Sequence, residues 1–172
     1  MAEQADRILP GLPVFPRTEN PVWPGLRVSG LVEKPTAFSL GDLKALPQTT
    51  VVADFRCEEG WVVPRQTWEG PRVAEVLRRV RVLPEARWIE AGAGDFTIAL
   101  SVEEALQGDA LLALRLNGEP LPPEHGGPCR LVVPGKACYT SVKWVDRLWL
   151  VADRPNEIGK AIALFRIGRE TL

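Results

Sequence analysis

The chain has few of the residues that hold most protein-bound metals. Its 172 residues include three cysteines, one histidine and one methionine, which is the first residue. A four-cysteine iron–sulfur cluster needs one more cysteine, and haem held by two histidines or by histidine and methionine needs ligands that this chain lacks. Zinc motifs built on two histidines are excluded for the same reason.

A strong charge of one sign and long apolar runs are also missing. The formal net charge is -1 and no block of basic residues occurs, which argues against a nucleic-acid partner. Nowhere do about 18 apolar residues follow one another, as a membrane-spanning helix requires. The start, MAEQADRILPGLP, has neither the apolar stretch nor the twin arginine of an export signal. We therefore expect a cytoplasmic protein with no membrane span and with reduced thiols.

Glycine and proline, in contrast, are abundant. Fifteen glycines and sixteen prolines are typical of a globular chain with many turns and short elements. Five of the prolines lie in residues 1–25 and predict an extended, proline-rich N-terminal arm. We expect residues 26–172 to form a single domain, because a chain of this length can bury one core without disulfides or metals.

The predicted strands outnumber the predicted helices. Alternating or β-branched runs predict strands over 26–32, 49–55, 88–90, 95–100, 111–116, 130–133 and 142–151. Short helices are predicted over 40–46 with Ser39 as its cap, from Pro71 with an apolar face to Val80, and between the Ser101 capping box and Gly108. Residues between Cys57 and Pro71 are predicted to form a loop. Regular βαβ alternation is absent, so we expect an α+β fold with mixed or antiparallel sheets.

Cys57 is the first candidate for chemistry. It lies where a predicted buried strand ends and a polar, glycine-containing loop begins. A thiol there can face a pocket, and the neighbouring Arg56 favours the thiolate that binds metal or attacks an electrophile. The alternative is that Cys57 is a small buried hydrophobic residue, since free cysteine is among the most buried residue types.

A second candidate is the cluster His125-Gly126-Gly127-Pro128-Cys129-Arg130, followed by Lys136 and by Ser141-Val142-Lys143-Trp144. It combines glycine backbone amides, an imidazole, a guanidinium and two ammonium groups within twenty residues. These groups suit an anion, most naturally a phosphate. The alternative is an ordinary loop whose basic side chains are solvated.

Two other sites use the same residues. His125, Cys129 and Cys138, joined by Cys57, would make a Cys₃His structural zinc site, although no C-x₂-C spacing occurs. Cys57 and His125 would alternatively make a nucleophile and base pair. A zinc site would suit a non-catalytic binding or subunit module.

Two sets of motifs resemble a known family. Phe55-Arg56-Cys57, Gly60-Trp61, Trp68-Glu69-Gly70 and the apolar helix that follows resemble the first signature of the sulfite-oxidase-type molybdopterin-binding domain. Leu116-Asn117-Gly118, the cluster from His125 to Pro134, and Ser141-Val142-Lys143-Trp144 resemble its second. Order and spacing agree over roughly residues 26–151.

The resemblance implies the family's fold and a molybdenum cofactor with one pyranopterin (molybdopterin). It implies that Cys57 is the thiolate ligand to molybdenum, a role that suits soft sulfur, and that His125, Arg130, Ser141, Val142 and Lys143 hold the pterin and its phosphate. The implied activity is that of an oxidoreductase transferring an oxygen atom to or from a small-molecule substrate. Since the chain cannot ligate haem or a four-cysteine cluster, we expect a separate electron-transfer protein as partner.

One departure from the family bears on the substrate. Glu58 and Glu59 follow the cysteine, where sulfite oxidases resemble Ala-Gly-Asn-Arg-Arg. Two carboxylates near the metal would repel a sulfite dianion. We therefore expect a substrate other than sulfite.

Overall fold

The computed structural model describes residues 22–56, 62–136, 140–159 and 161. Its strands are β1 (Leu26–Gly30), β2 (Thr36–Phe38), β3 (Gln48–Arg56), β4 (Val62–Pro71), β5 (Trp88–Ala93), β6 (Phe96–Ser101), β7 (Leu111–Ala113), β8 (Arg115–Leu116), β9 (Glu119–Pro120), β10 (Arg130–Val132) and β11 (Arg147–Val151). Its helices are α2 (Leu40–Ala45), α3 (Val73–Val80), α4 (Val102–Gln107) and the 3₁₀ turn η1 (Pro123–His125).

The described strands form three sheets. The largest has the order β2-β1-β11-β5-β6, a second has the order β3-β4-β8-β9, and β10 pairs with β7. β1 runs parallel to β11, whereas the other pairs are antiparallel. Mixed sheets with short, scattered helices confirm the predicted α+β class.

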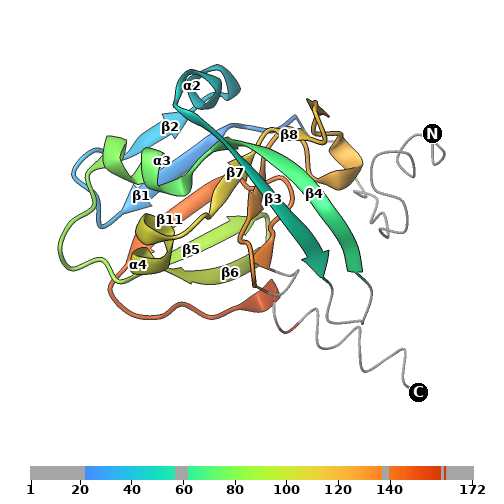
Figure 1. The fold of residues 1–172 in the computed structure, drawn as a ribbon. Helices are drawn as coiled ribbons and strands as arrows, with labels where there is room; N and C mark the ends of the chain where they lie inside the picture. Colours follow the sequence, from blue (N-terminus) through green and yellow to red (C-terminus); the bar gives the residue numbers. More distant parts are fainter. Residues whose placement is uncertain (1–21, 57–61, 137–139, 160, 162–172) are drawn as a thin grey trace.

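The main core lies between the five-stranded sheet and α3. The predicted apolar face of α3 is buried, including Val76 and Val80 at 0% exposure, and it packs in one cluster with Leu26, Ile89 and Leu148 of the sheet. Burying side chains of this size stabilises the fold by about 1.5–3 kcal/mol each. A smaller cluster around Trp68 and Leu116 lies beneath the β3–β4 hairpin, which Figure 1 shows as a long pair of strands along one side of the molecule.

The predicted loop between Cys57 and Pro71 is wrong over residues 62–71, which form β4. β4 pairs with β3 along its length and with β8 at Trp68 and Glu69. Hydrogen bonding to two neighbours outweighs the turn-forming Pro64 and Gly70, a contribution that local sequence does not show. Pro71 ends β4, and α3 begins two residues later at Val73, after Arg72 as N-cap.

The predicted strand over 142–151 is confirmed only for its second half, Arg147–Val151. Trp144 has a φ of 55°, a left-handed conformation that interrupts an extended strand. The carbonyl of Val142, two residues before it, accepts a hydrogen bond from Leu131 of β10. Hydrogen bonds from Lys143 and Trp144 to carbonyls of residues 123–126 stabilise this conformation.

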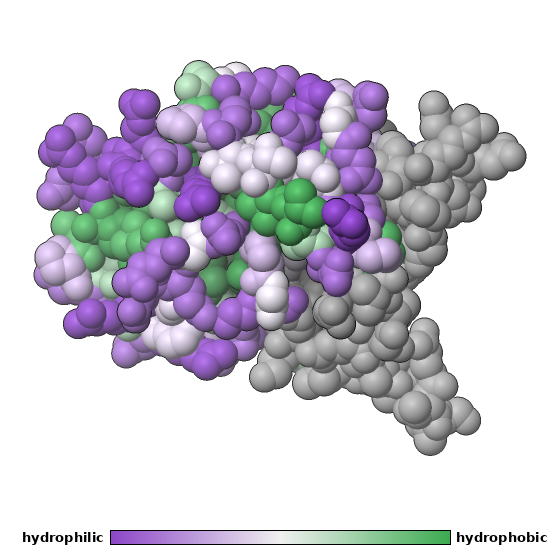
Figure 2. All heavy atoms as spheres, viewed as in Figure 1, coloured by the Kyte–Doolittle hydropathy of each residue, from purple (hydrophilic) through white to green (hydrophobic). Residues whose placement is uncertain are grey.

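The helix caps follow the sequence closely. Ser39 with Asp42 and Ser101 with Glu104 both form complete capping boxes, in which each side chain satisfies a backbone N–H at the helix start. None of the described helices has the length and apolar character that crossing a bilayer requires. On the face drawn in Figure 2, hydrophilic side chains predominate and hydrophobic ones form small separate patches.

Candidate cofactor site

The candidate site is built on the turn that contains η1. The backbone N–H groups of His125 and Gly127 both donate to the Pro122 carbonyl, at 3.0 and 2.9 Å. Gly126 has a φ of 99°, which favours glycine. A Cβ on Gly127 would lie 1.8 Å from the Leu121 carbonyl oxygen, so a side chain at this position does not fit. The two glycines therefore allow the turn to close.

Arg130 joins this turn to β10 and to β4. Its side chain is only 3% exposed, and its Nη1 donates to the carbonyl oxygen of His125 at 3.0 Å. Its guanidinium carbon lies 5.5 Å from the centre of the Trp68 ring, a distance at which the ring face attracts a cation. His125 itself is fully buried. Arg130 and His125 are thus part of one compact structure.

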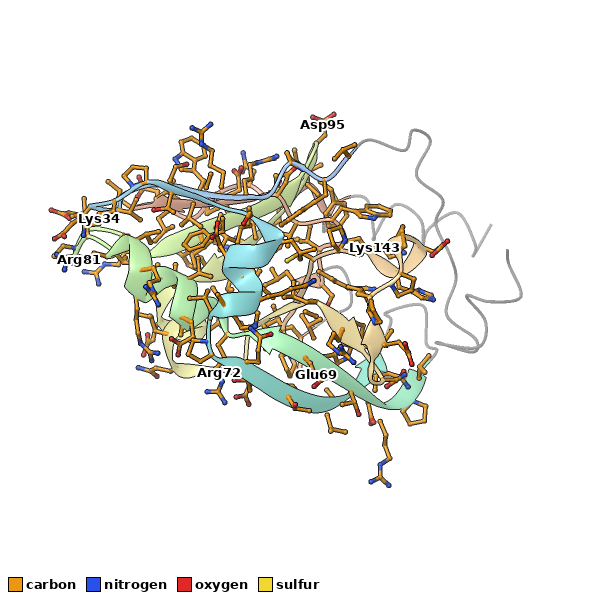
Figure 3. All side chains as sticks on the ribbon, turned by 90° about the horizontal axis from the view of Figure 1, so that it is seen from above. Lys34, Glu69, Arg72, Arg81, Asp95 and Lys143 are labelled. Carbon is orange, nitrogen blue, oxygen red and sulfur yellow. The ribbon has the colours of Figure 1, made fainter. Side chains whose placement is uncertain are left out.

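Lys143 also contacts this turn. Its Nζ donates to the Glu124 carbonyl at 3.0 Å and lies 5.7 Å from the Trp144 ring centre. Trp144 donates from its indole to the Pro123 carbonyl at 2.8 Å and from its backbone to the Gly126 carbonyl at 3.1 Å. The Lys143 side chain is partly exposed, and Figure 3 shows it toward the end of the molecule opposite Lys34 and Arg81.

Ser141 and Val142 complete the cluster. Both are buried, and the carbonyl of Val142 accepts a hydrogen bond from the Leu131 N–H at 2.9 Å. Three residues later Val145 donates to the Cys129 carbonyl at 3.1 Å. The structure therefore brings together all five predicted pterin and phosphate residues, His125, Arg130, Ser141, Val142 and Lys143.

The chemistry of this cluster fits the phosphate end of a pterin cofactor. Two side chains that are cationic at neutral pH, Arg130 and Lys143, donate to the carbonyls of adjacent residues in one turn. Guanidinium and ammonium groups are the usual partners of phosphate oxygens. Cys57, the predicted molybdenum ligand, lies outside the described residues, one position beyond the end of β3.

The zinc alternative receives no support from the part of the chain that the structure describes. Cys129 lies in the main apolar core at 0% exposure, and burial raises the pKa of its thiol, which disfavours the thiolate that binds metal. Among the described residues no group of three histidine, cysteine or acidic side chains is placed to hold a metal. Cys57 and Cys138 lie outside those residues.

Three residues of the site region make contacts that the sequence does not show, although Trp68 and Asn117 lie in motifs of the family resemblance. Trp68 fits a core residue by pattern, and its contact with Arg130 joins positions 62 residues apart in the chain, which no local signal shows. Asn117 marks a tight turn but also bonds to β4, and Gln66 is buried and hydrogen-bonded to it. The sequence signals in this region are the Asn-Gly pair, which is typical of a tight turn, and the Trp68-Glu69-Gly70 motif.

A cavity of about 240 Å³ borders the cluster at Thr140, next to Ser141. Its lining includes hydrophobic side chains from β5, β6 and the segment after β10. Two ion pairs also line it, Lys136 with Glu104 at 2.6 Å and Arg154 with Glu157 at 3.1 Å. The four charges of these pairs balance, so these lining residues carry no net charge.

The fold is an α+β domain, and Arg130 and Lys143 both donate to carbonyls of the glycine-containing turn. Residues 15–158 match the family model of the oxidoreductase molybdopterin binding domain. The chain belongs to this family, which confirms the family resemblance and the class of cofactor predicted from the sequence.

Individual relatives include several oxidoreductases. The chain is 36% identical over 121 residues to the oxidoreductase YuiH of Bacillus subtilis, covering 70% of this chain and 61% of that protein. It is 32% identical to the catalytic subunit of the protein-methionine-sulfoxide reductase MsrP of Xanthomonas campestris, covering 76% and 46%. It is 27% identical to the sulfite oxidase of Arabidopsis thaliana, covering 73% and 41%.

Among solved structures, the sulfane dehydrogenase SoxCD of Paracoccus pantotrophus is similar, with a TM-score of 0.70 and 32% identity. The match covers 75% of this chain and 38% of that chain, and it confirms the sulfite-oxidase-type fold. The chain thus spans less than two thirds of the length of each of these relatives.

Proposed function

We propose that this protein is a molybdenum-cofactor oxidoreductase that transfers an oxygen atom to or from a small molecule, with Cys57 as the protein ligand to molybdenum. The observation that carries the proposal is the convergence of Arg130 and Lys143 on adjacent carbonyls of one glycine-containing turn. This is the cation pair that the sequence assigns to the cofactor phosphate, in a chain of the molybdopterin-binding family.

Different residues of the cluster bind different parts of the cofactor. Lys143, the partly exposed cation, would hold the phosphate through its ammonium group, together with Ser141 and Val142, which precede it in the chain. Arg130 would add the charge of a buried guanidinium, and His125 of the same turn would help to hold the pterin. When bound, the cofactor supplies two-electron oxygen-atom chemistry, while the protein supplies orientation and electrostatics.

We propose further that the substrate is a neutral oxo compound of the sulfoxide class. Balanced ion pairs line the cavity beside Ser141, and Glu58 and Glu59 follow Cys57 in the sequence. Neither feature attracts an anion such as sulfite, whereas a neutral sulfoxide meets no repulsion. A relative at 32% identity is a protein-methionine-sulfoxide reductase subunit.

The proposed reaction reduces the sulfoxide to a thioether. The sulfur–oxygen bond breaks, and the oxygen leaves as water after taking up two protons and two electrons. The electrons arrive from a separate one-electron carrier protein, since the chain lacks the residues for a four-cysteine cluster and for haem held by two histidines or by histidine and methionine. The cytoplasmic location expected from the sequence is part of the same proposal.

The test of the cofactor is metal and pterin analysis of protein made in a host that synthesises molybdenum cofactor. We expect molybdenum and pterin in the parent, together with visible absorption from a molybdenum–thiolate bond. Cys57→Ser should lose that absorption, whereas the control Cys129→Ala, which removes a thiol from the core, should keep it. A parent without molybdenum from a host that loads a known molybdenum enzyme would overturn the proposal.

The test of the substrate uses the loaded protein and four oxo compounds, namely dimethyl sulfoxide, methionine sulfoxide, nitrate and sulfite. With a reduced viologen dye as electron donor, we expect turnover of dimethyl sulfoxide or methionine sulfoxide and little turnover of nitrate. With ferricyanide as electron acceptor, we expect no sulfite oxidation above that of Cys57→Ser. Sulfite oxidation faster than sulfoxide reduction would refute the sulfoxide assignment while leaving the cofactor assignment intact.

A further inference from the structure

We infer that Asn117 is a positioning residue, which fixes the segment of β4 directly before Trp68 and thereby orients Arg130 in the cofactor cluster. The inference rests on the proposed function, because it concerns how the phosphate-binding cation is held. The side chain of Asn117 bonds to Thr67 and Gln66 of β4, and through them it acts on the residues that hold Arg130.

Asn117 extends the pairing of β8 with β4 by means of its side chain. Its backbone N–H donates to the Thr67 carbonyl at 2.7 Å, and its Oδ1 accepts from the Thr67 N–H at 2.9 Å. Both polar backbone groups of Thr67 are thus satisfied by one residue. Asn117 has a φ of 50°, so the backbone leaves the extended conformation at this residue. Its side chain therefore supplies the next hydrogen bond to β4 in place of a backbone carbonyl.

The Nδ2 group of the Asn117 side chain also has a hydrogen-bond partner. Nδ2 of Asn117 donates to Oε1 of Gln66 at 2.9 Å, and Nε2 of Gln66 donates to the Pro64 carbonyl at 2.7 Å. Gln66 is 7% exposed, and leaving a buried amide group without its partner is costly. The network therefore fixes residues 64–67 of β4 relative to the turn at Asn117.

Trp68 follows this fixed segment directly. It is 1% exposed and pairs in register with Leu116, the residue before Asn117. Its ring lies under the Arg130 guanidinium, which in turn donates to the His125 carbonyl. A continuous set of contacts thus leads from the amide of Asn117, through Thr67 and Trp68, to the buried cation of the cluster.

Asn117 could matter only because it adopts the positive φ of its turn, or because its side chain positions β4. Different substitutions separate these two roles. Asn117→Gly keeps a residue that readily adopts positive φ but removes both side-chain hydrogen bonds. Asn117→Asp keeps the acceptor for the Thr67 N–H and also tolerates the left-handed region. Arg81→Gly is the matched control, because Arg81 has a φ of 54° and is exposed at the end of α3.

The first experiment compares these variants after loading with cofactor. We expect Asn117→Gly to fold but to contain several-fold less molybdenum and pterin than the parent, with an altered visible spectrum in the loaded fraction. Asn117→Asp should lie between the two, and Arg81→Gly should match the parent. Equal cofactor content and spectra for Asn117→Gly and the parent would overturn the inference.

The second experiment needs no cofactor and separates the inference from the proposed function. The Trp68 ring should displace the side-chain Nε–Hε NMR signal of Arg130 upfield, and Trp68→Phe with Arg130→Lys assigns that signal. We expect Asn117→Gly to lose the displacement and Asn117→Asp to keep most of it. An unchanged signal in folded Asn117→Gly would refute the positioning role even if the protein binds no molybdenum.

Discussion

Arg130 donates from Nη1 to the carbonyl oxygen of His125 at 3.0 Å, so a buried guanidinium joins the first residue of β10 to the end of the turn η1. The same guanidinium lies over Trp68 of β4. One side chain therefore links two of the described sheets to the loop that the sequence assigns to the cofactor.

Arg130→Ala should lower both stability and cofactor content. It removes a charge-assisted hydrogen bond and a cation–π contact from a site only 3% exposed, and we expect a loss of about 2–3 kcal/mol in the free energy of unfolding. Urea unfolding at neutral pH measures this change in the free energy of unfolding. The control Arg78→Ala removes an exposed i,i+3 ion pair with Glu75 and should cost about 0.5 kcal/mol or less; equal losses would contradict this account.

Gly127→Ala should disrupt the turn at the site. The added Cβ would meet the Leu121 carbonyl at 1.8 Å, and backbone cannot move aside as a flexible side chain does, so we expect a loss of about 3 kcal/mol or more. Gly94→Ala is the comparison, because its φ is 57° but nothing lies within 4 Å of the new atom. Backbone strain alone should cost it about 1–2 kcal/mol. Thermal unfolding that ranks Gly94→Ala as the more damaging change would refute the close-contact argument.

The ion pair between Lys136 and Glu104 predicts a pH-dependent contribution to stability. The hydrogen bond from Lys136, followed by those from Ser101, lowers the pKa of Glu104 below its ordinary value of 4.5 against the opposing effect of burial. A lowered pKa in the folded state stabilises the protein above that ordinary value, and the contribution is lost as the pH falls through the folded-state pKa.

Glu104→Gln tests this contribution, because glutamine keeps the capping box at the start of α4. Both charged side chains are nearly half exposed, at 47% and 44%, so solvent screening limits the expected loss at neutral pH to about 0.5 kcal/mol. The difference from the parent should vanish in acid and shrink with added salt. Glu103→Gln, on the same helical turn, controls for net charge, and a difference that persists at low pH would contradict the prediction.

Cys129 should be chemically inert in the folded protein. Its thiol is fully buried among apolar side chains, and desolvation raises its pKa, so almost no thiolate forms near neutral pH. We expect iodoacetamide to leave Cys129 unmodified until the protein is denatured, as peptide mass spectrometry would show. Modification at similar rates in the native and unfolded protein would show that this thiol is accessible.

The parts of the fold that sequence predicts well are those set by neighbours in the chain. The capping boxes at Ser39 and Ser101 and the apolar face of α3 depend on residues three or four positions apart, and side-chain geometry within one helix decides them. The candidate phosphate cluster was also visible, because its groups lie within twenty residues from His125 to Trp144.

Composition and local pattern are enough to establish one histidine, three cysteines, an α+β pattern and a basic, glycine-containing segment that resembles the molybdopterin-binding family. The distant residues that support this segment become apparent only in the folded protein. The pairing of β1 with β11 joins positions about 120 residues apart, β4 exists because β3 and β8 hydrogen-bond to it, and Trp68 meets Arg130 across two sheets. Such contacts depend on burial and on partners that become neighbours only when the chain has folded, so no local pattern encodes them.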